Sequence, residues 1–235
     1  MRKELKFWRW GVKHFIKRFL QLFYKTRLGY CGVDNDIHFP CHLGNPSHIF
    51  LQDFTLVQPD CRFIIHTGNV YIGKWSSLSC NCIVVTGNHV PTVGINQRLL
   101  ARTHINDRES DIHIDEDCWV GVRVTILSGT HLRRGSVVGA NSLLNKEYPP
   151  YAVLVGSPAR IIASKFTIDQ IMKHESLLYP EEERFTRTEL EDIFNNYYSD
   201  KKTIGIDQVK SVDIGYLLAN ANMQYKIDYK NYENR

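Results

Sequence analysis

Aliphatic side chains recur every six residues through the middle of the chain. From residue 114 to residue 144 six of them stand six positions apart: Ile114, Val120, Ile126, Leu132, Val138 and Leu144. Four positions after each of the first five comes a small or β-branched residue: Cys118, Val124, Thr130, Ser136 and Ser142. A helix needs a period near 3.6 and a strand a period of 2, so neither explains this pattern. The period predicts a parallel β-helix, in which three short strands and three corners make one coil.

The same register continues upstream with two shifts of phase. The aliphatic or aromatic positions there are Ile37, Leu43, Ile49, Leu51, Val57, Phe63, Ile72 and Leu78. The shifts follow Ile49 and Phe63, where we expect loops or irregular corners. Between Ile83 and Ile114 the period is lost for about thirty mostly polar residues, which include His89 and His104. A long loop inside a regular solenoid is usually functional. We therefore expect a β-helix over residues 32–164 with a protruding loop at about 86–112.

The N-terminal segment, residues 1–31, is expected to form a basic amphipathic helix. Its apolar positions recur at spacings of three and four: Trp8, Val12, Phe15, Phe19 and Leu22. Residues 1–27 hold nine Lys and Arg against one Glu, a balance of +8, so the remainder of this +4 chain carries −4. Such a helix suits contact with an anionic membrane surface, and equally packing on the β-helix or on a neighbouring subunit. Positive charge confined to one end argues against nucleic-acid binding.

No stretch of the sequence is apolar enough for a transmembrane helix, and no secretory signal is recognised. We therefore expect a cytoplasmic protein, with peripheral contact at the inner membrane face through residues 1–27 as one option. Three of the six cysteines, Cys41, Cys61 and Cys118, fall on the small corner position of the repeat. They are interpreted as small buried apolar residues, and disulfides are not expected in a reducing compartment.

The C-terminal extension, residues 165–235, is expected to be mainly helical. Thr167 with Gln170 and Thr186 with Glu189 each have the spacing of a capping box, and Pro180 should end the first helix. Before this extension, the segment from Tyr151 to Ile162 is expected to form one last strand and a corner. A helical cap has a physical reason, since the last coil would otherwise expose apolar interior and unpaired strand edges.

Several segments together resemble the hexapeptide-repeat acyltransferases. They are the run from Ile114 to Leu144, the segment Tyr148–Arg160, the stretch from Ile72-Gly73 to Val85-Thr-Gly-Asn-His89, and the unit Asp117–Gly121. The similarity is greatest to the branch that contains galactoside, maltose, nodulation and xenobiotic O-acetyltransferases. Residues 166–184 more loosely resemble tails of bacterial surface-polysaccharide acetyltransferases. The resemblance implies a left-handed parallel β-helix, a homotrimer with active sites between subunits, acetyl-CoA as co-substrate, and no required metal.

His89 is the predicted general base. Acyl transfer from a thioester needs a group that takes the acceptor's proton, and an imidazole that titrates near neutral pH suits this. His89 stands where the chain leaves the coil for the long loop, and it matches the catalytic histidine of the resembling branch. His104 in the same loop is the reserve candidate, and His66 is interpreted as structural.

The remaining site residues are implied by the resemblance. Asp60, Asn88 and Trp119 are expected to contact the acceptor. The expected coenzyme contacts are Trp119, backbone groups near Gly121 and Ala140, and the cations Arg160 and Lys165. Trp119 could equally do no more than fill one face of a coil. The loop after His89 is longer than in galactoside-type enzymes, so the acceptor pocket is expected to differ from theirs.

The sequence thus predicts an acetyl-CoA-dependent O-acetyltransferase acting on a sugar hydroxyl, in surface polysaccharide biosynthesis. A xenobiotic or an amino sugar is the alternative acceptor. A non-catalytic β-helix scaffold is a further alternative. A zinc enzyme of the carbonic anhydrase type is disfavoured, because no second histidine stands at the right spacing beside His89.

Overall fold

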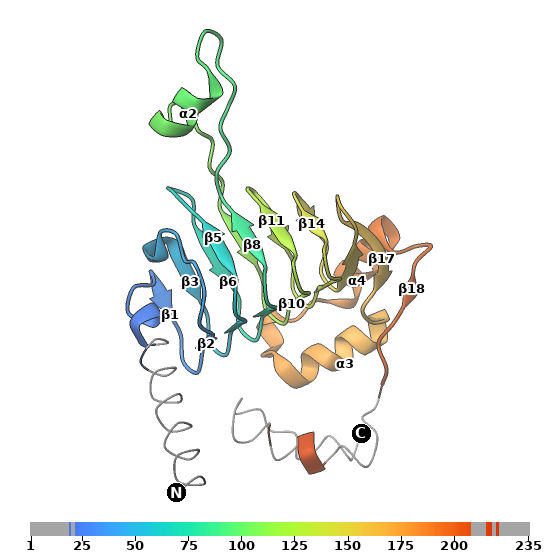
Figure 1. The fold of residues 1–235 in the computed structure, drawn as a ribbon. Helices are drawn as coiled ribbons and strands as arrows, with labels where there is room; N and C mark the ends of the chain where they lie inside the picture. The colour runs from blue at the N-terminus through green and yellow to red at the C-terminus, as the bar shows by residue number, and fades with distance from the viewer. Residues whose placement is uncertain (1–18, 20–21, 208–214, 218–219, 221–235) are drawn as a thin grey trace, which may run out of the picture. The chain divides into compact units, whose positions relative to one another are not determined.

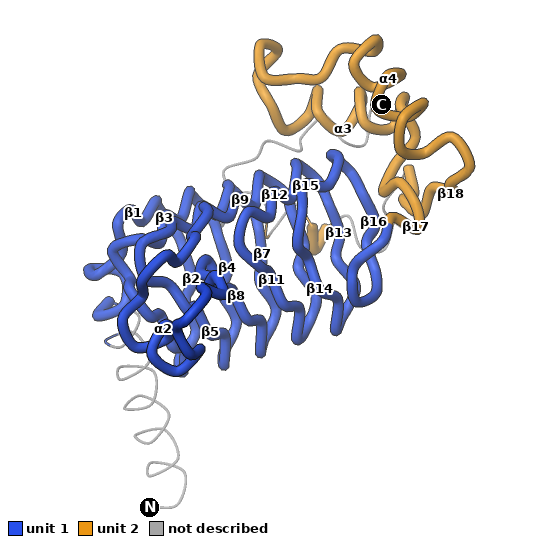
Figure 2. The backbone as a smooth tube through the Cα atoms, turned by 90° about the horizontal axis from the view of Figure 1, so that it is seen from above, with its two compact units in different colours: residues 1–160 blue, residues 161–235 orange. Residues whose placement is uncertain are grey.

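The computed structural model describes residues 19, 22–207, 215–217 and 220. Contacts divide the chain into a unit of residues 1–160 and a unit of residues 161–235, which Figure 2 colours separately. Most of the predicted N-terminal helix lies outside the described residues, although residues 22–25 are helical. Within the described residues, no helix has the length and apolar character needed to cross a membrane.

The first unit is a parallel β-helix with three sheets, as the six-residue period predicts (Figure 1). The first sheet consists of β1 (Tyr30–Cys31), β3 (Ile49–Leu51), β6 (Val70–Ile72), β9 (Ile112–Ile114), β12 (His131–Leu132) and β15 (Glu147–Tyr148). In this unit the second sheet runs through β2 (Asp36–Ile37), β4 (Leu56–Val57), β7 (Ser77–Leu78), β10 (Trp119–Val120), β13 (Val137–Val138) and β16 (Ala152–Val155). The third sheet consists of β5 (Arg62–Ile64), β8 (Ile83–Val85), β11 (Thr125–Leu127) and β14 (Leu143–Leu144). A 3-10 helix, η1 (Pro46–His48), precedes β3.

Each aliphatic position of the repeat lies in a column that runs through successive coils. Val120, for example, pairs in parallel register with Leu78 on one side and Val138 on the other. All six aliphatic residues between positions 114 and 144 are at most 1% exposed. The small residues at the corner positions are buried with them, the most exposed being Cys118 at 2%. The hexapeptide interpretation is therefore confirmed, since one large and one small side chain per hexad fill the interior.

Coils approach too closely at some corners for any side chain. A Cβ atom added to Gly121 would lie 2.6 Å from the carbonyl oxygen of Val138 in the next coil. Gly135 combines a positive φ of 74° with a Tyr151 ring that would lie 2.4 Å from its added Cβ. Glycine is required at both places, because backbone or a packed ring occupies the space.

The outer side of the first sheet carries a stack of rings, one from each of four coils. Phe50 stacks on Tyr71 with ring centroids 4.9 Å apart, and Tyr71 stacks on His113 at 4.8 Å. His113 and His131 follow at 5.2 Å. The Nε2 atom of His131 lies 2.8 Å from an oxygen of Asp115. Strand register alone produces this stack, because parallel in-register strands place equivalent side chains beside each other.

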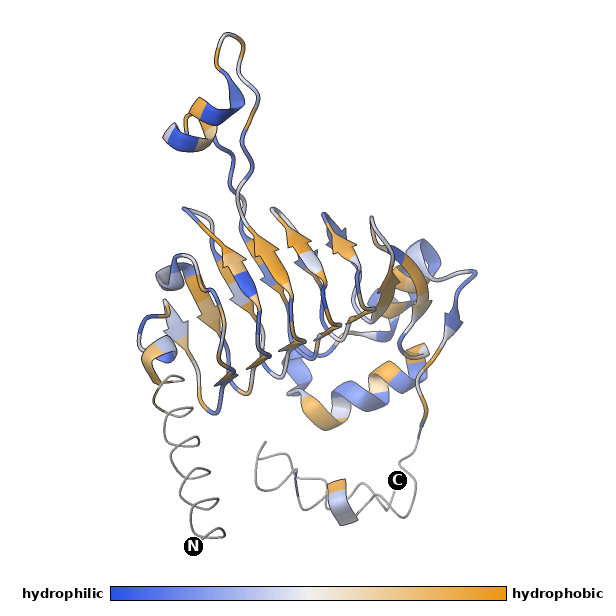
Figure 3. Cartoon of the chain, in the orientation of Figure 1, coloured by the Kyte–Doolittle hydropathy of each residue, from blue (hydrophilic) through white to orange (hydrophobic). Residues whose placement is uncertain are grey.

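The outer side of the third sheet is mainly apolar, with Arg62 on β5 and Thr125 on β11 as its polar members. Ile64 on β5 is 49% exposed and Ile83 on β8 is 38% exposed. Leu127 on β11 and Leu143 on β14 continue this side and are half-buried. Figure 3 shows the apolar colour along these strands. A patch of this kind is typical of a surface that another protein surface covers.

The long loop leaves the coil after β8 and returns before β9. It carries the helix α2 (Gln97–Thr103) and projects away from the stacked coils (Figure 1). Asn96 caps this helix by accepting a hydrogen bond from the Leu99 amide, 3.0 Å away. Leu100 is fully buried and anchors the helix, although its neighbours are exposed.

The second unit contains β17 (Arg160–Ser164), which begins at the last residue of the first unit, and β18 (Lys202–Thr203), which pairs with it in parallel. Its helices are α3 (Ile168–Leu178), the 3-10 helix η2 (Glu181–Glu183) and α4 (Arg187–Tyr197). Both predicted capping boxes are present, at Thr167 and Thr186, and α3 ends two residues before Pro180.

The prediction of one last strand between Tyr151 and Ile162 is wrong. Two strands occupy this segment and the residues that follow it, β16 and β17. Gly156 has a φ of +101° and lies between them with Pro158. The turn of these two residues ends the first strand, and the apolar residues after it form a second one.

Candidate active site

His89 lies at the root of the long loop, four residues after the end of β8. The two limbs of the loop are hydrogen-bonded to each other at this root. The Arg108 amide donates to the carbonyl of Asn88 over 3.1 Å, and the Ser110 amide donates to the carbonyl of Thr86 over 3.3 Å. The outgoing limb, which carries His89, is therefore held beside the returning limb.

A carboxylate from the returning limb fixes this root to the preceding coil. Glu109 accepts hydrogen bonds from the amides of Thr67 (2.9 Å) and Gly68 (2.6 Å) and from the hydroxyl of Thr86 (2.7 Å). Partial burial acts to raise the pKa of Glu109, but these hydrogen bonds to its charged form outweigh burial and hold the pKa below its usual value. Glu109 is thus an anionic clamp at physiological pH.

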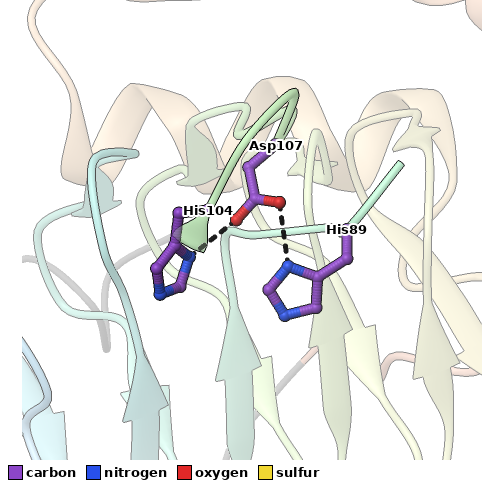
Figure 4. Close-up of side chains that lie close together, drawn as sticks. All are labelled: His89, His104 and Asp107. Carbon is purple, nitrogen blue, oxygen red and sulfur yellow. Dashed lines mark hydrogen bonds and ion pairs between the residues drawn. The ribbon is translucent and has the colours of Figure 1, made fainter. Parts of the chain in front are cut away.

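Asp107 binds two imidazoles at once, as Figure 4 shows. One of its oxygens lies 2.8 Å from Nδ1 of His89, and the other lies 2.8 Å from Nδ1 of His104. Hydrogen bonds from His89 and then from His104 lower the pKa of Asp107, so the carboxylate is charged near neutral pH. A carboxylate can only accept, so each neutral imidazole donates from Nδ1 and keeps a free electron pair on Nε2.

These side chains differ in their exposure to solvent. The side chain of Asp107 is only 10% exposed, whereas those of His89 and His104 are 43% and 40% exposed. The carboxylate is therefore shielded from solvent and lies between the two rings, which are accessible to a ligand. This is the arrangement that an orienting carboxylate and a proton-accepting imidazole require.

His104 is held in place from three directions. It is the C-cap of α2, with a left-handed φ of 53°, and its amide donates to the carbonyl of Leu100 over 2.8 Å. Its Nδ1 meets Asp107, and its ring stacks on His66 with centroids 4.4 Å apart and an angle of 16° between the planes. The rings of His104 and His89 have centroids 5.6 Å apart. His66, interpreted from the sequence as structural, supports the second imidazole of this cluster.

The other predicted acceptor contacts are spread over the coils. Asn88 is exposed beside His89. Asp60 is exposed at the corner between the second and third sheets, with a left-handed φ of 64°, whereas His89 follows the third sheet at the next corner. Trp119 on β10 is 54% exposed, because its neighbours in register are the smaller Ser77 and Val137. Within one chain, therefore, the structure brings Asn88 to His89 but places Asp60 at a different corner.

The predicted coenzyme contacts are divided between the two units. Gly121 and Ala140 are neighbours across two coils, since a Cβ on Gly121 would lie 2.9 Å from the Ala140 amide nitrogen. The Gly121 amide already donates to Val138 over 2.8 Å, so a coenzyme contact here would use another backbone group. Arg160 is exposed at the end of the first unit. Lys165 belongs to the second unit, where its ammonium lies 5.3 Å from the centre of the Phe166 ring.

Asp107 is the residue that sequence reasoning missed. It lies eighteen positions after His89 in a segment without any period. The only available signal was an acidic residue in the same loop as two histidines. Among the described residues, His89, His104 and Asp107 are also the one group of three whose potential metal-ligating atoms all lie within 4.8 Å of one another.

Comparisons with known proteins find similar acetyltransferases. No family model matches the chain. A Schizosaccharomyces pombe protein named "Putative acetyltransferase C18B11.09c" is 34% identical over 113 residues, which cover 44% of this chain and 54% of that protein. The chain thus spans about half the length of this curated relative.

Two solved structures share the fold. A hexapeptide-repeat acetyltransferase of Vibrio cholerae complexed with acetyl-coenzyme A is 25% identical with a TM-score of 0.55, over 61% of this chain and 75% of that one. A maltose O-acetyltransferase of Clostridium difficile is 25% identical with a TM-score of 0.53, over 60% of this chain and 72% of that one. The repeat, the buried columns and these likenesses agree: the β-helical part of this chain is similar in sequence and fold to hexapeptide-repeat acetyltransferases.

Proposed function

We propose that this protein transfers an acetyl group from acetyl-CoA to a hydroxyl group of a sugar, with His89 as the general base. The observation that carries the proposal is the Asp107 carboxylate, which lies 2.8 Å from Nδ1 of His89 and leaves Nε2 free on an exposed ring. A base near neutral pH with its second nitrogen oriented by a carboxylate is the group that acyl transfer to an alcohol needs.

In the proposed reaction, Nε2 of His89 removes the proton of the acceptor hydroxyl as its oxygen attacks the thioester carbonyl carbon. The carbon–sulfur bond then breaks, and the thiolate takes the proton from the imidazolium to leave as the free thiol of CoA. Asp107 stays ionised throughout. It stabilises the imidazolium that forms and keeps the ring in the tautomer that accepts at Nε2.

The acceptor and coenzyme contacts are part of the same proposal. Trp119 offers a flat, half-exposed ring for the acceptor or the pantetheine arm. Asn88 and Asp60 would bind acceptor hydroxyl groups, and Arg160 and Lys165 would meet phosphates of CoA. The maltose O-acetyltransferase among the similar structures supports a sugar acceptor. The resemblance of residues 166–184 to tails of polysaccharide acetyltransferases supports a sugar of surface polysaccharide.

We further propose that the active protein is a homotrimer joined through the third sheet. Support comes from its mainly apolar outer side, where Ile64 and Ile83 remain 49% and 38% exposed in a single chain beside one cation, Arg62. Half-buried Leu127 and Leu143 continue the same surface. At about 25 cal/mol per Å² of apolar area removed from water, covering this surface would stabilise a subunit interface.

The decisive experiment follows release of free thiol from acetyl-CoA in the presence of a panel of sugars, amino sugars and chloramphenicol. Wild type and His89→Ala are compared at equal concentration, after their oligomeric states are shown to match. The proposal predicts turnover with a sugar and a loss of roughly 10²–10⁴-fold in His89→Ala, the usual contribution of a general base. An unchanged rate in His89→Ala would remove His89 from the mechanism, and turnover with chloramphenicol or an amino sugar alone would replace the acceptor.

A further inference from the structure

We propose that His89, His104 and Asp107 form a binding site for a divalent metal ion of borderline softness such as Zn²⁺, and that the bound ion switches the base off. The inhibitory part rests on the proposed function, whereas the binding part does not. The proposal concerns regulation of the site, because the transfer reaction described above needs no metal.

The ligand set suits such an ion. Imidazole nitrogen and carboxylate oxygen are common zinc ligands, and three protein ligands with one water complete a tetrahedral site. The candidate atoms all lie within 4.8 Å of one another. Zinc binds such atoms at roughly 2.0–2.2 Å, so the ligands would have to close in by about 1 Å or less. Both rings are about two-fifths exposed, which gives them room to move and gives a water molecule access.

The ligands are held together before any ion arrives. His104 is fixed by its position as C-cap of α2 and by stacking on His66 at 4.4 Å. The limb that carries Asp107 is fixed by the hydrogen bonds that Glu109 accepts from the preceding coil. A metal site whose ligands are already in place loses little conformational entropy when it binds, which favours affinity.

A second set with the same residue types provides a comparison. On the first sheet, His113 and His131 have ring centroids 5.2 Å apart, and His131 makes a 2.8 Å contact with Asp115. Within the described part of the chain, however, only His89, His104 and Asp107 bring three ligand atoms within 4.8 Å. Composition alone therefore does not make the site. The convergence of the two limbs of the loop does.

The consequence for catalysis follows from the nitrogen that faces Asp107. Nδ1 is the atom of both rings that points to the carboxylate, so Nδ1 would bind the ion. A neutral imidazole that binds a metal through Nδ1 carries its single proton on Nε2. The electron pair that would take the acceptor's proton is then absent. The ion also occupies the carboxylate that would otherwise stabilise the imidazolium of His89.

The test measures zinc binding and acetyl transfer separately on the full-length protein. Zn²⁺ alone is titrated in competition with a chromogenic zinc indicator for wild type, His104→Asn and His131→Ala. Asn tolerates the left-handed backbone at position 104 but lacks the imidazole ligand. Transfer is then measured for each variant with and without Zn²⁺, as a ratio within that variant, and again after a chelator is added.

The proposal predicts one Zn²⁺ per wild-type chain and an affinity roughly 10²-fold weaker in His104→Asn, with His131→Ala unchanged. Transfer by wild type and by His131→Ala should fall at least tenfold when the site is filled and should return with the chelator, whereas His104→Asn should be unaffected at the same ion concentration. Equal affinity in wild type and His104→Asn would overturn the site. Binding at the site with undiminished transfer would overturn the switch. If the protein transfers no acetyl group at all, the proposed function fails and the binding titration still decides the site.

Discussion

Replacing Asp107 by Asn tests the role of the carboxylate without removing any bulk. Asp107 accepts from two imidazoles, each at 2.8 Å. An amide has one oxygen that accepts and one nitrogen that donates, so it can serve only one of the two rings in that way. The ring that faces the amide nitrogen must place its proton on Nε2. If the two amide orientations are equally populated, His89 has the wrong tautomer in about half of the molecules, which is roughly a twofold loss.

A second loss comes from the missing charge. Hydrogen bonds to charged groups contribute about 1.5–3 kcal/mol and neutral ones about 0.5–1.5 kcal/mol, so the difference is about 1–1.5 kcal/mol. Because about 1.4 kcal/mol corresponds to a factor of ten in rate, this accounts for a further loss of roughly tenfold. Asp107→Asn should therefore reduce kcat/KM by about 10–30-fold. The KM for acetyl-CoA should not change, since Asp107 contacts the two imidazoles and is not among the proposed coenzyme contacts.

The assay is release of free thiol from acetyl-CoA under saturating acceptor, with His89→Ala measured alongside. A rate within twofold of wild type would show that the carboxylate does not orient His89. A loss as large as that of His89→Ala would show that Asp107 does more than orient the ring. Either result would contradict the proposed role of Asp107.

Three further predictions concern the scaffold. The pKa of Glu109 is lower in the folded protein than in the unfolded chain, so the ionised side chain stabilises the fold. This stabilisation is present above the usual glutamate pKa of about 4.3 and is lost as the pH falls through the lower pKa of the folded state. Glu109→Gln should therefore flatten the dependence of Tm on pH between about 6 and 3. An unchanged dependence would contradict the stabilising role of the ionised Glu109 side chain. Gly121→Ala should lower the free energy of unfolding in urea by about 1–3 kcal/mol, because the added Cβ would lie 2.6 Å from the Val138 carbonyl oxygen. An unchanged free energy of unfolding would contradict the close packing of coils. Ile83→Lys on the third sheet should convert trimers to monomers in sedimentation at micromolar concentration. The control Val93→Lys, on the exposed loop, should leave the trimer intact. A trimer that survives Ile83→Lys would place the interface elsewhere.

The fold could be predicted from the sequence because every coil of the solenoid is packed in the same way. Each hexad places one large and one small side chain in the interior, so the period is visible even where single residues vary. The six aliphatic residues from Ile114 to Leu144 are all buried for this reason. The capping boxes at Thr167 and Thr186 were equally readable, because the two residues that make each bond are only three positions apart.

The site could be predicted only in part, because a loop has no period. His89 was predicted as the base from its place at the end of a coil and from the resemblance to a known family. Asp107 was not identified, since its contact with His89 depends on how the two limbs of the loop meet. The helix α2 was missed as well, because its seven residues expose most of their side chains and only Leu100 is buried. The extra strand β17 was missed, because the turn at Gly156 looks in sequence like the end of the coils.

The proposed role of His89 is tested most directly by a crystal structure of the protein with CoA and an acceptor sugar. We expect the coenzyme sulfur and the acceptor hydroxyl both to lie close to His89, with the hydroxyl oxygen about 2.6–3.2 Å from Nε2. Nδ1 of His89 should remain bound to Asp107 in that complex. A coenzyme bound along another face, with its sulfur more than about 10 Å from His89, would contradict the assignment, because no proton could pass between them directly.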